Sequence, residues 1–499
     1  MDDIRKRKLR LNTLFGVLNQ IVVVICGLIL PRLILLTYGS QINGLVNSIT
    51  DILGVISLLE LGMGTVVQSA LYKPLADNDF IQINKIYNSA KKFFRIISYI
   101  FAVYIVILVI LYPLFFRADY DTFFSAMLII SISISMFAQY YFGIINSLLL
   151  QADQLNYIYF IIQIATTILN TALCCVEIKL GWSIIVVKLT TSMVYLFRPI
   201  LLYAVVRKKY SFLSKIEVKE NVLPQKWNGF AQHIAAFVLQ NTDVLVLTFL
   251  STLENVSIYS VYYLIAKSLV QLIVSYMSGY QSLMGNMIAK KESKAFVSFF
   301  KNKELTIHIV TTLIFSIAAV LIVPFVRIYT KGVTDAQYEQ RMFSILLLAS
   351  QWLWCLRMFY YIPVKAVGDY KSTQKSAIIE AILNLTISIC VVWKFGLCGV
   401  AIGTLASIMY RTIYLIHYNY KYMFNGDSKD IIKLFGTDFC VTLVTCALSQ
   451  VISFSPNNYF EWFICAFFET FIVCVIGVMV YGISYFRLVR AFASLKRKQ

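Results

Sequence analysis

Charge is scarce in this sequence. Asp, Glu, Lys and Arg make up 14% of its 499 residues, whereas about 25% is usual for a soluble protein. No polar stretch between two apolar segments is long enough to form a separate soluble domain. So few charges could not cover a globular surface, and this excludes an ordinary water-soluble enzyme.

Metal-binding and disulfide patterns are also missing. The ten cysteines form no Cys-x-x-Cys pair, and most lie inside apolar segments, where small buried side chains are typical. The three histidines, His233, His308 and His417, lack the spacing of metal ligands. We therefore expect neither a metal nor another cofactor.

Long apolar segments dominate instead. Hydrophobic residues make up 59% of the chain, and the mean hydropathy is +0.74. The segments are near the ~20 residues that a helix needs to cross the hydrocarbon core. We expect an all-α polytopic membrane protein with about fourteen transmembrane helices. Their ranges are 11–37, 42–72, 93–116, 122–150, 156–178, 181–206, 226–251, 256–286, 303–328, 341–366, 372–393, 398–420, 433–454 and 459–486.

The first apolar segment has the outline of a secretory signal, because it follows four basic residues from Arg5 to Lys8. It continues, however, from Leu11 to about Leu36, and it lacks a small-residue cleavage site. We expect a retained first helix rather than a cleaved leader.

The distribution of lysine and arginine predicts the orientation. With the N-terminus in the cytoplasm, inside loops and termini hold 32 of the 44 basic residues, outside loops hold six, and six lie within helices. Such a bias over short loops sets the topology, and an even number of crossings places both termini inside. The net charge of +19 follows largely from this bias. It indicates attraction to anionic lipids and not a nucleic-acid partner.

Weak internal similarity recurs at an offset of roughly 211–215 residues. The matching pairs are Gln68-Ser69 with Gln281-Ser282, Pro113 and Arg117 with Pro324 and Arg327, Ile168-Leu169-Asn170 with Ile382-Leu383-Asn384, Gly181 with Gly396, and Tyr195 and Arg198 with Tyr410-Arg411. A constant offset predicts two six-helix halves followed by two further helices. The expected domains are an N-lobe at 1–210, a basic cytoplasmic linker at 211–225, a C-lobe at 226–422, and helices 13 and 14 with a basic tail at 423–499.

Because six is even, both halves start on the same side of the membrane. Such parallel repeats are related by a pseudo-two-fold axis along the membrane normal. This arrangement is typical of transporters that hold substrate at a central site and work by alternating access.

Three segments near the N-terminus carry a family resemblance. Residues 38–48 read YGSQINGLVNS, residues 58–64 read LLELGMG, and residues 70–76 read ALYKPLA. Together with the layout of six, six and two helices, they resemble the bacterial polysaccharide flippases of the multidrug/oligosaccharidyl-lipid/polysaccharide exporter superfamily, which have a MATE-like fold.

The resemblance implies a carrier in the bacterial cytoplasmic membrane. Its substrate would be an undecaprenyl-pyrophosphate-linked oligosaccharide, moved to the outer leaflet for O-antigen, capsule or exopolysaccharide synthesis. Its implied partners are membrane lipids, a proton or sodium ion as the driving ion, and the glycosyltransferases and polymerase of polysaccharide assembly.

Six basic residues lie deep within the predicted helices, away from the helix ends. They are Arg32, Lys188, Arg198, Lys267, Arg357 and Arg411. Each costs about 2.5–3.5 kcal/mol in hydrocarbon, so each should face a cavity or a partner. As a cationic lumen they would offset the desolvation of a pyrophosphate. Arg32 and Lys267 are the leading candidates, because the first and eighth helices line the central cavity in relatives of the family that the chain resembles.

Structural pairing is the alternative for these charges. Arg32 has a depth compatible with Asp51, and Lys267 with Asp243. Among the acids in the membrane, Glu60, Asp243 and Glu380 are the candidates for ion coupling, with a structural role again as the alternative.

Other functions remain open. A multidrug or metabolite antiporter of the same superfamily is the nearest, and an acidic cation-binding pocket would favour it. A membrane-embedded polymerase or acyltransferase is disfavoured, because the longest outer loop, near 328–341, offers only Lys331, Asp335 and Glu339. A scaffold for a glycan-assembly complex is a third class.

Overall fold

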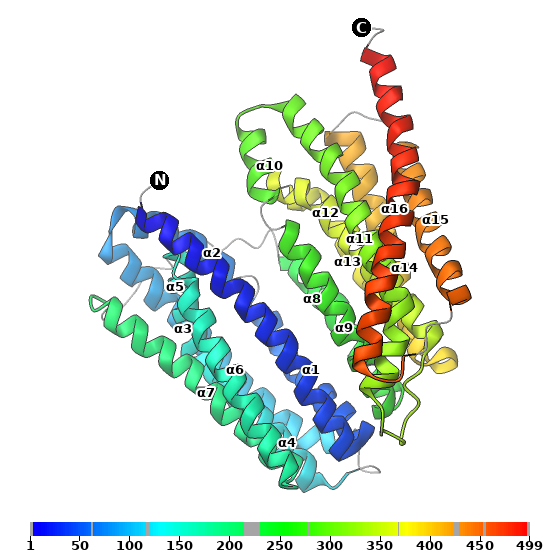
Figure 1. Cartoon of the computed structure of the whole chain (residues 1–499). Coiled ribbons are helices and arrows are strands. Elements are labelled where there is room, and N and C mark those ends of the chain that lie inside the picture. The colour runs from blue at the N-terminus through cyan, green and yellow to red at the C-terminus, as the bar shows by residue number, and fades with distance from the viewer. Residues whose placement is uncertain are drawn as a thin grey trace. The chain divides into compact units, whose positions relative to one another are not determined.

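The computed structural model is helical in all its regular elements (Figure 1). It describes residues 3–60, 63–115, 120–213, 230–277, 280–367, 369–423, 429–452 and 456–496. None of these residues lies in a β-strand. The chain divides into two compact units, Met1–Phe237 and Val238–Gln499.

The first unit runs from blue to green in Figure 1. Its elements are α1 (Asp3–Gly54), the 3₁₀-helix η1 (Val55–Glu60), α2 (Met63–Asp77), α3 (Phe80–Phe115), α4 (Thr122–Ala138), the π-helix η2 (Gln139–Gly143), α5 (Ile144–Ala152), α6 (Asn156–Lys179) and α7 (Ile184–Lys209). α1 packs along α6, and α7 packs on both α4 and α6.

The second unit begins within α8 (Phe230–Leu250). Its further elements are α9 (Leu253–Met277), α10 (Tyr280–Ala289), α11 (Ser293–Tyr329), α12 (Arg341–Val367), α13 (Tyr370–Phe395), α14 (Leu397–Tyr418), the π-helix η4 (Asn419–Met423), α15 (Lys429–Ile452) and α16 (Tyr459–Lys496). α14 packs against both α12 and α13, while α15 and α16 pack on α11.

Three predicted segments differ from the structure in their local geometry. Segments 11–37 and 42–72 are joined without a loop, because α1 bends at Gly39, where φ is 86° and ψ is 174°. Glycine reaches this conformation without the steric cost that a Cβ would bring. The predicted helix 122–150 is interrupted by η2, a wider turn of the kind that often marks functional sites.

The prediction of an all-α polytopic membrane protein is confirmed in a coarser form. Within the described residues, twelve helical stretches are long and apolar enough to cross a bilayer. The first of them, Arg10–Glu60, contains the bend at Gly39 and takes in parts of two predicted segments. Residues 226–229 of the predicted segment 226–251 lie outside the described residues. The count of fourteen, the domain boundaries and the symmetry axis stay predictions.

Apolar side chains point outward on the spanning helices. On α3, Val103 and Ile110 are 61% and 62% exposed, and on α16 Phe467 is 74% exposed. Polar side chains of the same helices, such as Ser98 and Glu469, are completely buried. This inversion is costly in water and favourable in hydrocarbon, where polar groups must find partners inside the protein.

Helix starts recur along the chain with a nearly constant offset. α3 begins at Phe80, and its counterpart α11 begins at Ser293. In the same way α6 begins at Asn156 and α13 at Tyr370, while α7 begins at Ile184 and α14 at Leu397. The spacing within each of these three pairs falls inside the range of offsets that the sequence repeats show.

A buried polar network attaches α15 and α16 to the rest of the second unit. His308 on α11 lies with Nδ1 2.6 Å from Oδ2 of Asp438 on α15 and with Nε2 2.9 Å from the Tyr360 hydroxyl on α12. The hydroxyl of Tyr481 on α16 donates to the other carboxylate oxygen of Asp438. His308 and Asp438 are inaccessible to solvent. Four helices therefore meet at one buried contact between His308 and Asp438, which sequence inspection did not reveal.

Replacing Tyr481 by phenylalanine should destabilise the protein by about 1 kcal/mol, because it removes one hydrogen bond to a buried carboxylate inside a membrane protein. The measurement is the thermal unfolding midpoint in detergent. Tyr422→Phe is the control, since that side chain is 63% exposed. Equal midpoints for wild type and Tyr481→Phe would contradict an anchoring role.

Candidate functional site

Arg198 on α7 is held by neutral groups. Its Nε donates to the Thr166 hydroxyl at 2.6 Å, and its Nη2 donates to the Thr167 hydroxyl at 2.7 Å. The guanidinium carbon lies 3.8 Å from the ring centroid of Tyr195, which is close enough for a cation–π interaction. These contacts orient Arg198 without neutralising its charge.

A cavity of about 270 Å³ lies beside this arginine. Its lining comes from α1, α6 and α7: Val23, Cys26, Gly27, Leu30, Pro31, Gln163, Thr167, Asn170, Thr171, Tyr195 and Arg198. None of these lining residues is acidic. The arginine has five N–H donors, and the two threonines use two of them. The cavity can therefore receive an anionic group.

In the second unit, two arginines share one carboxylate. Nη1 of Arg411 on α14 donates to Oε2 of Glu380 on α13 at 2.6 Å, and Nη1 of Arg357 on α12 donates to Oε1 of the same residue. All three side chains are buried, with exposures of 8% or less. The guanidinium of Arg357 also lies over Trp354, and that of Arg411 over Tyr361. The trio carries a net charge of +1.

The donors of this trio are not all satisfied. Nε of Arg411 is buried and has no hydrogen-bond acceptor among the described residues. An unsatisfied charged donor in a buried position is costly. Like Arg198, the trio can therefore accept a further negative charge.

The two sites occupy equivalent places in the internal repeat. Arg198 and Arg411 are separated by the repeat offset, and so are their acceptors Thr166 and Glu380. In each unit the arginine reaches across to the preceding helix. The acceptor is a hydroxyl in the first unit and a carboxylate in the second. Arg198 therefore keeps its whole positive charge beside the cavity, whereas Arg411 shares a carboxylate.

The other three predicted basic residues lie apart from these contacts. Arg32 follows Pro31 on α1 and is half-buried. Lys188 on α7 is half-buried, and no carboxylate of the described residues lies within ion-pairing distance of it. Lys267 on α9 is exposed, with its Nζ 5.6 Å from the ring centroid of Tyr263.

The three acidic candidates for ion coupling all have partners. Oδ2 of Asp243 accepts from the Tyr259 hydroxyl at 3.0 Å and Oδ1 from the Thr404 hydroxyl at 2.6 Å. Within the described ion pairs, Asp243 is not joined to Lys267. Glu60 lies within hydrogen-bonding reach of Tyr140. Glu380 is held between its two arginines, so releasing it would leave both unpaired.

The loop between α11 and α12, which the sequence predicts to lie outside, offers few groups suited to catalysis. Glu339 accepts two hydrogen bonds of 2.7 Å from the guanidinium of Arg327. This contact holds the pKa of Glu339 below its usual range, so the residue is unsuited to act as a general acid near neutral pH. Among the described residues, no group of three His, Cys, Asp or Glu side chains could hold a metal ion.

No protein-family model matches the chain, and no curated protein matches it. Solved structures do match. "Lipid II flippase MurJ, inward closed conformation" aligns with a TM-score of 0.72 and 15% identity, over 96% of this chain and 100% of that chain. An inward-facing multidrug resistance MATE family transporter of the MOP superfamily aligns with a TM-score of 0.57 and 13% identity, over 79% and 93%.

A MATE protein in the bent conformation aligns with a TM-score of 0.51 and 13% identity, over 88% of this chain and 97% of that chain. None of the three is described as an enzyme. At these identities the similarity shows the fold, which is the MurJ/MATE-like fold of the MOP superfamily. The predicted resemblance is thus confirmed at the level of fold, and the polysaccharide branch stays a prediction.

Proposed function

We propose that the chain is a flippase for undecaprenyl-pyrophosphate-linked oligosaccharide repeat units. It would move them from the cytoplasmic to the outer leaflet of the bacterial cytoplasmic membrane for surface polysaccharide synthesis. The observation that carries the proposal is the cavity beside Arg198, which has a cationic lining without a carboxylate. The fold shared with a lipid II flippase supports it.

The physical task of such a protein is to lower the cost of desolvating a pyrophosphate. A bilayer interior offers no hydrogen bonds, so the phosphate oxygens need fixed donors along their path. Arginine donates through a planar fork that matches phosphate, and lysine acts as a point charge. We assign this role to Arg32, Lys188, Arg198, Lys267, Arg357 and Arg411, while the isoprenoid tail stays in the lipid.

The transport cycle would proceed by alternating access, with both termini in the cytoplasm. Glu60, Asp243 and Glu380 are the proposed sites of coupling to a proton or sodium gradient. Partners would be the membrane lipids and the polymerase or glycosyltransferases of the same polysaccharide.

A multidrug or metabolite antiporter is the second candidate, and the fold shared with a MATE transporter favours it. A cationic drug needs an accessible carboxylate. Asp243 and Glu380 are buried and already accept hydrogen bonds from other side chains. An anionic substrate is therefore the better match to the described cavity.

Replacing Arg32 or Lys267 by alanine should abolish surface polysaccharide while the protein stays at normal abundance in the membrane. Each change removes one cation from the proposed path. The measurements are surface polymer by immunoblot and protein level in the membrane fraction. Lys294→Ala is the control, because Lys294 is exposed near the start of α11. Normal surface polymer in both variants would remove these two residues from the proposed path.

A further inference from the structure

A second cationic cavity lies in the first unit and includes none of the six basic residues discussed above. It has a volume of about 290 Å³. One wall comes from α3, where Tyr87, Lys91 and Arg95 are spaced four residues apart. Residues at this spacing share one face of a helix. Two cations and an aromatic ring therefore point the same way over two turns.

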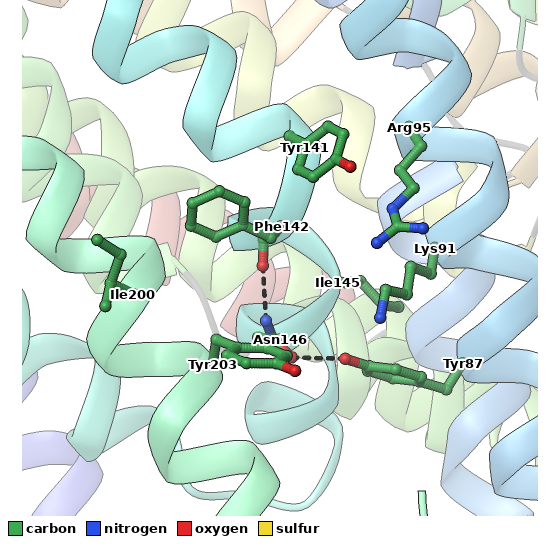
Figure 2. Close-up of a pocket in the computed structure, with 9 residues that line it drawn as sticks. All are labelled: Tyr87, Lys91, Arg95, Tyr141, Phe142, Ile145, Asn146, Ile200 and Tyr203. Atoms are coloured by element: carbon green, nitrogen blue, oxygen red, sulfur yellow. Dashed lines mark hydrogen bonds between the residues drawn. The ribbon is translucent and has the colours of Figure 1, made fainter. Parts of the chain in front are cut away.

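The opposite wall comes from η2 and α5. Tyr141 and Phe142 belong to η2, whose wider turn precedes Asn146 on α5. Asn146 is buried and satisfied: its amide donates to the Phe142 carbonyl at 2.6 Å, and its oxygen accepts from the Tyr87 hydroxyl at 2.8 Å. Figure 2 shows these two bonds, with Lys91 and Arg95 on the same side as Tyr87 and facing the residues of η2 and α5.

Among the residues that the structure describes, Arg95 forms no ion pair with a carboxylate. Its guanidinium carbon lies 5.0 Å from the ring centroid of Tyr141. Its Nε is buried and has no hydrogen-bond acceptor among the described residues. None of the lining residues is acidic. A buried, charged donor without an acceptor costs free energy that an anionic ligand would recover.

Ordinary snorkelling does not explain this geometry. An arginine that only extends its head to water keeps its donors solvated. Here Nε is enclosed, and the guanidinium faces a cavity rimmed by Tyr203 and Ile200 of α7. The exposed neighbour Lys92, one residue along the same helix, is not part of the lining.

The cavity lies near the point where the apolar runs of α3 and α7 meet basic residues, and lipid headgroups are expected at this level. On α3 the basic residues precede a long apolar run, and on α7 the cavity residues precede the basic end Arg207 to Lys209. Beyond Arg95, Tyr99 and Val103 are 58% and 61% exposed, so an apolar surface continues from the cavity along α3. A ligand with a phosphate head and an acyl or isoprenyl tail would place the head in the cationic cavity and the tail along the apolar surface of α3.

We propose that this cavity binds the phosphate group of a membrane lipid, with Arg95 and Lys91 as the donors. The phosphate belongs either to an anionic phospholipid of the bilayer or to the diphosphate of an isoprenoid-linked lipid. The site goes beyond the proposed flippase function, because its ligand binds whether or not transfer occurs.

The test measures lipid retention by the purified full-length protein in native mass spectrometry. The probes are phosphatidylglycerol, undecaprenyl diphosphate and zwitterionic phosphatidylcholine. We expect the double variant Lys91→Gln/Arg95→Gln to lose at least tenfold in affinity for phosphatidylglycerol, undecaprenyl diphosphate or both, and the probe that loses affinity identifies the source. Lys92→Gln is the matched control and should bind as wild type does.

A second variant keeps the test decisive if the double variant Lys91→Gln/Arg95→Gln fails to fold. Ile200→Trp fills the cavity and leaves both cations in place, so it should also lose the phosphate lipid. Wild-type affinity for both phosphate lipids in the double variant and in Ile200→Trp would overturn the proposal. An equal loss of phosphatidylcholine, whose phosphate is balanced by its choline, would overturn it as well, since the site would then not select lipids of net negative charge. Because binding is measured without transfer, failure here leaves the proposed flippase function untouched.

Discussion

Replacing Arg198 by glutamine is expected to slow transfer of a diphosphate-linked lipid roughly 10- to 150-fold. A hydrogen bond to a charged group contributes about 1.5–3 kcal/mol, and each 1.36 kcal/mol changes a rate tenfold. Arg198→Lys keeps the charge and loses the planar fork, so an intermediate rate is expected. The assay is transfer by purified protein in proteoliposomes.

Two comparisons separate this role from a structural one. Arg207→Gln removes the same charge from the exposed end of α7 and should leave the rate unchanged. The double variant Thr166→Val/Thr167→Val removes the contacts that fasten Arg198 to α6 but keeps the cation. If Arg198 only fastened the helices, this double variant would lose as much transfer as Arg198→Gln. We expect it to retain most of the transfer.

Glu380→Ala is expected to destabilise the protein by about 3–5 kcal/mol, because it leaves two buried arginines without their shared carboxylate. That is a large part of the 5–15 kcal/mol by which proteins are typically stable. Abundance in the membrane and the unfolding midpoint should both fall sharply. Glu339→Ala, at a half-exposed ion pair, should change stability by no more than about 1 kcal/mol.

A triple variant tests the physical reason for that loss. Replacing Arg357, Glu380 and Arg411 together by Met, Leu and Met removes every buried charge of the trio. Apolar replacement of a whole buried ionic cluster is often neutral or stabilising, so abundance should return. Transfer should not return, since two proposed phosphate donors are gone. If the triple variant were as unstable as Glu380→Ala, the loss would not arise from unpaired charge.

The helices themselves were predictable because their signal is local. Apolar runs near the length of a membrane crossing are read directly from the sequence, as are the lysine and arginine bias and the offset of the repeats. The bend at Gly39 was missed because it interrupts the helix for one residue only. The π-helix at 139–143 was missed because a single wider turn leaves no break in a long, mainly hydrophobic segment.

The charged sites were predictable as residues but not as contacts. Arg357, Glu380 and Arg411 were all singled out by their position in apolar segments. Their contact joins three helices, however, and the hydrophobic periodicity of one helix does not indicate which residues of other helices it meets. The suggested ion pairs joined sequential helices, such as Lys267 with Asp243, whereas Asp243 accepts from Thr404, which is 161 residues away in the sequence. Such pairings follow from packing, which sequence periodicity does not encode.

Two other clusters were passed over for identifiable reasons. Lys91 and Arg95 were not singled out from the sequence, although their spacing with Tyr87 indicates one helix face. His308 was set aside for lack of metal-ligand spacing, and its partner Asp438 lies 130 residues away in the sequence. A search for basic residues in register with aromatic ones would have found the first cluster. No sequence signal would have found the second.

The most direct test of a carrier for phosphate-linked saccharides compares two glycolipids in proteoliposomes. Both carry the same sugar and the same isoprenoid tail, joined by a diphosphate in one and by a neutral ether in the other. Transfer is followed by the access of a membrane-impermeant sugar oxidant to the labelled sugar. The account predicts protein-dependent transfer of the diphosphate lipid and at least tenfold slower transfer of the neutral one. Equal rates for the two lipids would contradict it.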